Sequence, residues 1–230
     1  HYFASSFANG LFEFRNGEFV NHYDYQNSIL ESAVPNNRNY VRVSSVIFDN
    51  DGNLWCVNTT NVADIVKVLK RNGEWVSLNY KDIEYMETMV KPYIDSRGWL
   101  WVISLQGEPG LFCAKTNGTP FDTSDDQTRK WTHKFVNQDG LGYDIYQLFD
   151  IAEDKDGVIW VGTNIGVFVI DNPEKFFDDG VFKQIKIARN DGTGLADYFM
   201  SGVFIKDIEV DGANRKWIGT SNNGIYLVSA

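Results

Sequence analysis

The sequence predicts an all-β protein made of repeated antiparallel sheets, because one turn motif recurs at long, similar intervals and the chain is rich in aromatic residues. Aromatic residues make up 15% of the chain, which suits sheets whose rings pack between layers. Four segments share the pattern Asp, two residues, Gly or Asn, two residues, Trp. They are Asp49, Gly52 and Trp55; Asp95, Gly98 and Trp101; Asp154, Gly157 and Trp160; and Asp211, Asn214 and Trp217.

The spacing of the motif predicts the architecture. Successive tryptophans are 46, 59 and 57 residues apart, and Phe3 stands in the tryptophan position 52 residues before Trp55. Periods of about 40–50 residues, each holding four short strands, are typical of β-propeller blades. We therefore expect a β-propeller fragment of about five blades, each a four-stranded antiparallel meander, forming a single region over residues 1–230. The expected divisions are a part-blade at 1–40, blades at 41–85, 86–140 and 141–190, and a part-blade at 191–230.

Each part of the repeat has a structural reason. Before the aspartate, apolar residues alternate, as at Val46 and Phe48, which indicates a half-buried first strand. The aspartate can accept backbone N–H groups two residues on, and the Gly or Asn supplies a positive φ. The tryptophan then begins the second strand, and its ring is large enough to fill the space between blades. Burial of such a ring contributes several kcal/mol, at about 25 cal/mol per Å² over roughly 150–250 Å².

The third and fourth strands follow from weaker signals. A Gly-aliphatic-aromatic triplet, which begins at Gly10, Gly110, Gly166 and Gly224, predicts the third strand. Fourth strands are expected at residues 74–78 and 130–134. The longer intervals between motifs are assigned to two polar loops, at residues 116–128 and 188–202.

The chain begins in the second strand of one predicted blade and stops in the third strand of another. An unpaired sheet edge favours aggregation, so a closed propeller usually joins strands from its two ends. We expect an open arc of a larger wheel, of about seven blades. A closed five-bladed ring is the alternative.

Composition and charge exclude several kinds of partner. The net charge of −10 argues against binding to nucleic acid, which relies on lysine and arginine. No apolar run is long enough for a membrane span in this chain.

Cys56 and Cys113 lie in predicted strands, where buried free thiols are expected and a disulfide is the alternative.

The sequence offers no catalytic, metal-binding or cofactor-binding residue. His1, His22 and His133 are scattered, and no P-loop, Gly-x-Ser-x-Gly or His-Glu-x-x-His pattern occurs. The segments at 49–53 and 154–157 look like the start of a calcium loop but lack its final glutamate, so we expect hairpin capping there. The acidic loop at Asp122, Asp125 and Asp126 is expected to be solvated, with an ion or partner contact as the alternative. The chain is therefore predicted not to be an enzyme.

Residues 154–167 resemble the two-component regulator propeller repeat. That repeat builds the periplasmic sensor regions of hybrid histidine kinases. Residues 190–198, residues 210–220 and the opening through Phe14 are in addition similar to PorZ-like proteins, propeller-containing components of the type IX secretion attachment machinery.

The second resemblance implies a non-catalytic scaffold in the periplasm or on the outer cell surface that works with a sortase and an anionic lipopolysaccharide. Its expected partners are proteins, a glycan or glycolipid, and the rest of the parent protein. The alternatives are a periplasmic ligand-sensing domain of a hybrid sensor histidine kinase, for a carbohydrate breakdown product, and a propeller lyase or glycosidase.

Overall fold

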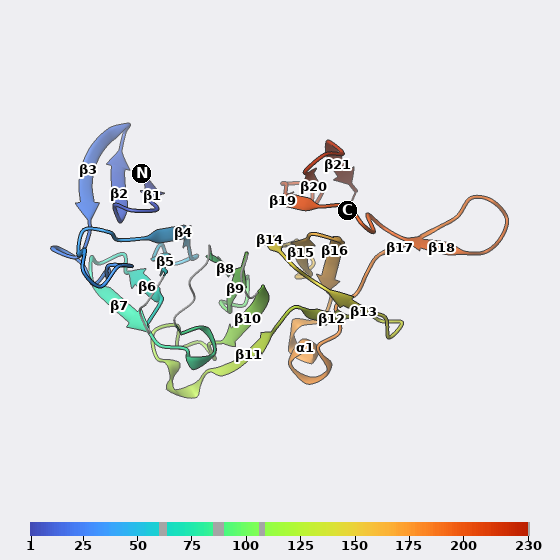
Figure 1. Cartoon of the computed structure of the whole chain (residues 1–230), viewed down its shortest axis with the longest axis horizontal. Helices are drawn as coiled ribbons and strands as arrows, with labels where there is room; N and C mark the ends of the chain where they lie inside the picture. The colour runs from blue at the N-terminus through green and yellow to red at the C-terminus, as the bar shows by residue number, and fades with distance from the viewer. Residues whose placement is uncertain (60–63, 85–89, 106–108, 230) are drawn as a thin grey trace. The chain divides into compact units, whose positions relative to one another are not determined.

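The computed structural model describes residues 1–59, 64–84, 90–105 and 109–229. The chain forms two compact units. Unit 1 comprises residues 1–107 and 112–130, and unit 2 comprises residues 108–111 and 131–230. The expectation of an all-β protein is confirmed: antiparallel sheets dominate both units, and the described residues contain one α-helix and two short 3₁₀ turns (Figure 1).

Unit 1 contains three sheets that follow the chain in order. A three-stranded sheet is followed by two four-stranded meanders, and the chain always passes to a neighbouring strand. Short 3₁₀ turns lie at Lys81–Ile83 and Thr123–Asp125. The first sheet holds β1 (Tyr2–Ser5), β2 (Leu11–Arg15) and β3 (Glu18–Tyr23); the second holds β4 (Val43–Phe48), β5 (Leu54–Asn58), β6 (Val66–Leu69) and β7 (Trp75–Leu78); the third holds β8 (Val90–Ile94), β9 (Leu100–Ser104), β10 (Gly110–Lys115) and β11 (Gln127–Trp131).

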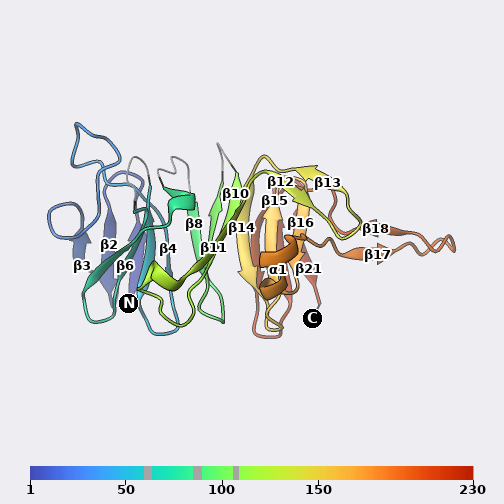
Figure 2. The same cartoon turned by 90° about the horizontal axis from the view of Figure 1, so that it is seen from below.

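Unit 2 contains two three-stranded sheets, two separate hairpins and a helix. In Figures 1 and 2 the second hairpin, β17–β18, projects away from the other elements of this unit. The sheets are β14 (Leu148–Glu153), β15 (Ile159–Thr163) and β16 (Gly166–Ile170), and β19 (Ile205–Val210), β20 (Lys216–Thr220) and β21 (Ile225–Val228); the hairpins are β12 (Lys134–Val136) with β13 (Gly142–Asp144) and β17 (Lys186–Ala188) with β18 (Ala196–Tyr198); the helix is α1 (Pro173–Asp179).

The tryptophans occupy equivalent positions, as the repeat predicts. Each is the second residue of the second strand in its sheet, on β5, β9, β15 and β20. Phe3 is likewise the second residue of its strand, but that strand, β1, is the first of its sheet. Trp55, Trp101 and Trp160 are at most 5% exposed, whereas Trp217 is 41% exposed. Trp217 lies on β20, in the sheet formed by β19, β20 and β21.

The cores lie between neighbouring sheets within each unit. In unit 1, Trp55 packs in one cluster with Leu100 and Phe112 of the third sheet. In unit 2, Trp160 packs in one cluster with Ile205 and Ile218 of the following sheet. At these two positions the tryptophan ring therefore packs between neighbouring sheets.

Two details of the predicted blades are wrong. Among the described residues, two of the sheets have four strands and three have three. In unit 2 the fourth strand beside β16 is reduced to a single bridge between Val169 and Lys183, because Asn172 caps a helix that begins at Pro173. The strand expected at 130–134 is also displaced, since β11 ends at Trp131 and β12 begins at Lys134.

The two predicted loops contain regular structure. The segment 188–202 includes the turn of the β17–β18 hairpin and all of β18, and the segment 116–128 includes a 3₁₀ turn and the start of β11. Both cysteines are free and buried, which confirms the expected free thiols, and burial raises the pKa of Cys56 to about 12. No helix in the described residues is long and apolar enough to cross a membrane.

Candidate functional site

The repeat aspartates build the turns between the first and second strands. The Oδ1 atom of each accepts the backbone N–H groups two and four residues on, at distances of 2.8–3.1 Å, for Asp49, Asp95, Asp154 and Asp211. The Oδ2 atom of each accepts the indole N–H of the tryptophan six residues on, at 2.8–3.0 Å. The motif therefore fixes the orientation of the tryptophan ring, and these carboxylates have structural partners on both oxygens.

Asn214 replaces the glycine of the other three repeats and links two turns in unit 2. Its φ of +60° lies in the same left-handed region that Gly52, Gly98 and Gly157 adopt. Its Oδ1 accepts the backbone N–H of Lys155 at 2.9 Å, and its Nδ2 donates to Asp156 Oδ2 at 3.0 Å. Asparagine tolerates this backbone conformation and adds an amide that glycine lacks.

Lys216 forms a second link between the same two turns. Its Nζ lies 2.9 Å from Asp154 Oδ2, and both side chains are about 5% exposed. Burial acts to raise the pKa of the Asp154 carboxyl. Hydrogen bonds from Lys216, Trp160 and the Val158 N–H, together with the charge of Lys216, outweigh burial and place the pKa below its usual 3.8. The carboxylate form is thus favoured in the folded protein.

Asp154→Asn is expected to weaken unit 2 at neutral pH and to reduce its sensitivity to acid. Because the folded pKa of Asp154 is lowered, its stabilisation is present above about pH 4 and is lost as the pH falls through the folded value. Urea denaturation at pH 7 and about pH 3 should show a smaller pH-dependent change for the variant than for the wild type. Asp171→Asn is the control, because it removes a half-exposed partner of Lys183. It should change the free energy of unfolding and its pH dependence little. Equal pH dependence of Asp154→Asn and the wild type would contradict this account.

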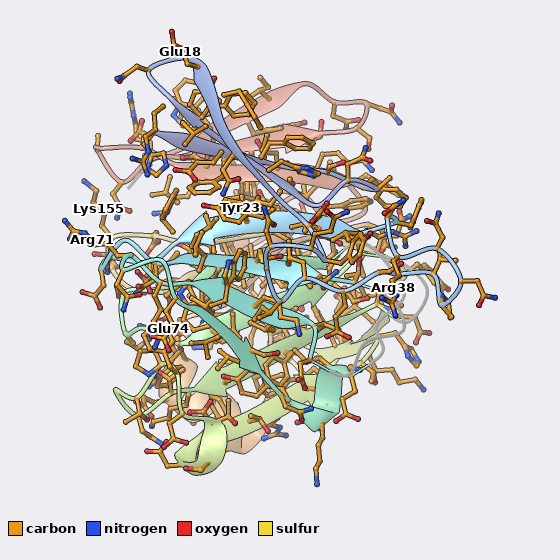
Figure 3. The ribbon with its side chains drawn as sticks, turned by 90° about the vertical axis from the view of Figure 1, so that its left-hand side faces the viewer. Glu18, Tyr23, Arg38, Arg71, Glu74 and Lys155 are labelled. Carbon is orange, nitrogen blue, oxygen red and sulfur yellow. The ribbon has the colours of Figure 1, made fainter. Side chains whose placement is uncertain are left out.

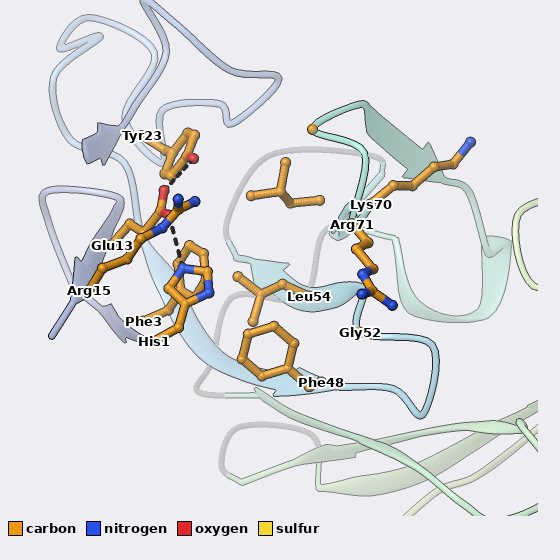
Figure 4. Close-up of a pocket in the computed structure, with 12 residues that line it drawn as sticks. His1, Phe3, Glu13, Arg15, Tyr23, Phe48, Gly52, Leu54, Lys70 and Arg71 are labelled. Carbon is orange, nitrogen blue, oxygen red and sulfur yellow. Dashed lines mark hydrogen bonds and ion pairs between the residues drawn. The ribbon is translucent and has the colours of Figure 1, made fainter. Parts of the chain in front are cut away.

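Unit 1 contains a cavity of about 450 Å³ beside the first sheet (Figure 4). Its apolar walls are Phe3, Phe48, Leu54 and Leu69, and the rings of Phe3 and Phe48 meet edge to face at 5.8 Å. Phe3 stands where the other repeats carry tryptophan, so the smaller ring leaves room here. The cavity is lined by residues of β1–β3 on one side and by the turns of the β4–β7 sheet on the other.

Glu13 organises one wall of the cavity. This side chain is 4% exposed. Its Oε1 accepts Arg15 Nη2 at 2.9 Å and lies 2.9 Å from His1 Nε2, while its Oε2 accepts the Tyr23 hydroxyl at 2.7 Å. Burial, followed by the hydrogen bond to Glu13, raises the pKa of Tyr23, which keeps the hydroxyl protonated as a donor. The network holds Arg15 and Tyr23 in fixed orientations at the cavity.

The opposite wall carries two cations from the turn between β6 and β7. Lys70 pairs with Glu74 at 3.0 Å. The Arg71 guanidinium forms no ion pair within the described residues, and its backbone N–H donates to Asn53 Oδ1. Figure 4 shows Arg71 across the cavity from Arg15, with apolar side chains between them.

The sequence did not reveal this cavity. The predicted repeat residues lie at the turns of separate sheets and are not brought together at one site; of these twelve, Gly52 alone lines the cavity. The one available signal was phenylalanine at the tryptophan position of the first repeat. The described residues contain no group of three His, Cys, Asp or Glu side chains arranged to hold a metal ion.

Comparison with known proteins agrees with the repeat. The family described as two component regulator propeller matches residues 140–164, which span the turn at Asp154 and the strand that carries Trp160. These residues are thus similar to a two-component regulator propeller repeat. The resemblance of residues 154–167 to that repeat is thereby confirmed. The comparison with curated proteins found no match.

Solved structures extend the similarity to the whole chain. PorZ, a surface component of the type IX secretion system of Porphyromonas gingivalis, is 28% identical with a TM-score of 0.85, over 99% of this chain and 30% of PorZ. The extracellular domain of the hybrid two-component system BT3049 from B. thetaiotaomicron is 19% identical with a TM-score of 0.58, over 99% of this chain and 26% of that one. These similarities confirm the β-propeller fold, and the chain spans less than a third of either relative.

Proposed function

We propose that this regulator-propeller chain is a non-catalytic recognition and scaffold module of a PorZ-like component of the type IX secretion machinery. The observation that supports it is the similarity to PorZ, at 28% identity and a TM-score of 0.85 over 99% of the chain. The extracellular domains of the regulator systems BT3049 and BT4673 are less similar to this chain, each with a TM-score of 0.58. By this proposal the parent protein lies in the cell envelope, in the periplasm or on the outer surface.

The site residues support a role without catalysis. The repeat aspartates are held by turn hydrogen bonds, and Glu13 is enclosed by three donors, so none of these acids is poised as a free general acid or base. Turnover of a polysaccharide or ester that is abolished by one acidic substitution would contradict this part of the proposal.

The β17–β18 hairpin offers a surface for a protein partner in the secretion machinery. At its base, Ile185 and Phe199 pack against the core of unit 2. Strand alternation puts Ile187 and Leu195 on the same face further out, where they are 51% and 55% exposed. The same face also carries the Arg189–Asp197 ion pair, so two exposed apolar side chains lie beside charged groups. A projecting face of this mixed kind, continuous with the core, suits a docking surface.

The experiment uses the full-length protein in the bacterium that encodes it. Deletion of the gene should reduce the amount of type IX cargo attached to the cell surface, and the wild-type gene should restore it. The double variant Ile187→Asp, Leu195→Asp should fail to restore attachment while accumulating normally. Phe19→Asp, at a 59% exposed position on β3, is the matched control and should restore it.

The sensor alternative is supported by the regulator-propeller match and makes a different prediction. For a ligand-sensing domain, deletion would leave cargo attachment intact and abolish a transcriptional response to a carbohydrate breakdown product. Intact attachment in the deletion strain would therefore overturn the proposal.

A further inference from the structure

The cavity in unit 1 has an excess of positive charge in a chain of net charge −10. Three of its lining residues carry a permanent positive charge, Arg15, Lys70 and Arg71, whereas Glu13 is the one acid among the lining residues. Lys70 forms an ion pair with Glu74, which does not line the cavity. Arg15 forms an ion pair with Glu13. This leaves Arg71 without an ionic partner in the described part of the chain.

Arg15 retains donors that its partner does not use. Its Nε and Nη2 both donate to the same oxygen, Glu13 Oε1, at 3.1 and 2.9 Å. A guanidinium has five N–H donors, so at least three remain, and the side chain is 62% exposed toward solvent. Glu13 therefore holds the Arg15 side chain in place and leaves at least three of its N–H donors available for a ligand.

The rest of the cavity is apolar. Phe3, Phe48, Leu54 and Leu69 form walls between the two arginines, and the volume of about 450 Å³ is that of a small-molecule site. An anion placed between two guanidinium groups is attracted to both. Guanidinium groups bind carboxylate and phosphate oxygens with paired, charge-assisted hydrogen bonds.

We propose that this cavity binds a small organic oxyanion, a molecule that carries one carboxylate or phosphate group on an apolar body. The oxyanion lies between Arg15 and Arg71, and the apolar body rests against Phe3, Phe48 and Leu54. The Glu13 network with Tyr23 orients Arg15 for this contact. The inference rests on unit 1 alone and does not depend on the role in type IX secretion.

The test compares matched probes on the full-length protein by saturation-transfer NMR at neutral pH. Benzoate and phenyl phosphate carry the oxyanion, and benzamide has the shape of benzoate without the charge. We expect benzoate, phenyl phosphate or both to bind in the millimolar range, and benzamide to bind at least about tenfold more weakly. Binding of one anionic probe but not the other distinguishes a carboxylate from a phosphate ligand.

Two variants locate the binding. Arg71→Gln should reduce the affinity for the anionic probe at least about tenfold, because it removes a charged pair of donors from an exposed side chain. Phe3→Trp should also reduce it by filling the cavity. Arg38→Gln is the control, since Figure 3 shows Arg38 on a different part of unit 1 from Arg71.

Three results would overturn the inference. They are no binding of either anionic probe, binding of benzamide as tight as that of the tighter anionic probe, and equal affinities of Arg71→Gln and Arg38→Gln for that probe. Because Arg71 is exposed, its variant should keep the thermal midpoint of the wild type. The comparison of Arg71→Gln with Arg38→Gln therefore tests the inference even if Phe3→Trp disturbs the first sheet.

Discussion

Trp160→Ala is expected to lower the free energy of unfolding of unit 2 by about 3–5 kcal/mol. The ring is 5% exposed and packs in one core cluster with Val167, Ile205 and Ile218. Its removal takes away that burial and leaves a cavity between two sheets that cannot fully collapse. It also leaves Asp154 Oδ2 without the indole donor at 3.0 Å.

Trp217→Ala is the matched control for this prediction. Trp217 occupies the same position in its strand and donates the same hydrogen bond, to Asp211 at 3.0 Å, but its ring is 41% exposed. Urea denaturation followed by circular dichroism should give a loss for Trp217→Ala that is about half of that for Trp160→Ala or less. Equal losses would show that the hydrogen bond, rather than the buried wedge, carries the effect.

Gly10→Ala is expected to destabilise unit 1 by about 2–5 kcal/mol, the sum of a backbone and a packing penalty. Gly10 has a φ of +71°, which costs an L-residue about 1–2 kcal/mol. An added Cβ would also lie 2.1 Å from the carbonyl oxygen of Tyr23, so the chain at the end of β3 must move. This contact explains why glycine stands directly before β2.

Gly17→Ala separates the two penalties. Gly17 joins β2 and β3 with a φ of +84°, but no atom lies within 4 Å of its added Cβ. This variant should therefore cost only about 1–2 kcal/mol, the backbone penalty. Both variants can be compared by urea denaturation, and a cost for Gly10→Ala no larger than that for Gly17→Ala would contradict the predicted steric conflict.

The parts of the fold that were predicted correctly depend on residues close together in the sequence. Asp154 and Trp160 are six residues apart and form a single turn, so the pattern alone shows both the turn and the strand after it. The same local pattern identified Phe3 as the equivalent residue of the first sheet. The hydrogen bond from the indole to the aspartate was missed, although the constant spacing of six residues was visible.

The parts that were missed depend on competition or on distant contacts. The sequence Asn172-Pro173-Glu174 is a good helix start, and it displaced the fourth strand that the repeat led us to expect. The turn at Asn190 and Gly192 could equally have indicated a hairpin rather than a loop. The cavity joins Glu13 and Arg15 to Arg71 across more than fifty residues, and no sequence pattern connects them.

The link that Asn214 makes bears on how such repeat proteins diversify by duplication. A repeat with glycine at this position has no side-chain amide there and cannot make this link to a neighbouring turn. Asn214 instead requires a neighbour whose turn offers a carboxylate at the place of Asp156. The other repeats have Asp51, Arg97 and Ala213 at that place, so only the first of these preserves the acceptor. The repeats that contain Asp156 and Asn214 therefore depend on each other. Recombination that separates them removes the hydrogen bonds of Asn214 to Lys155 and Asp156.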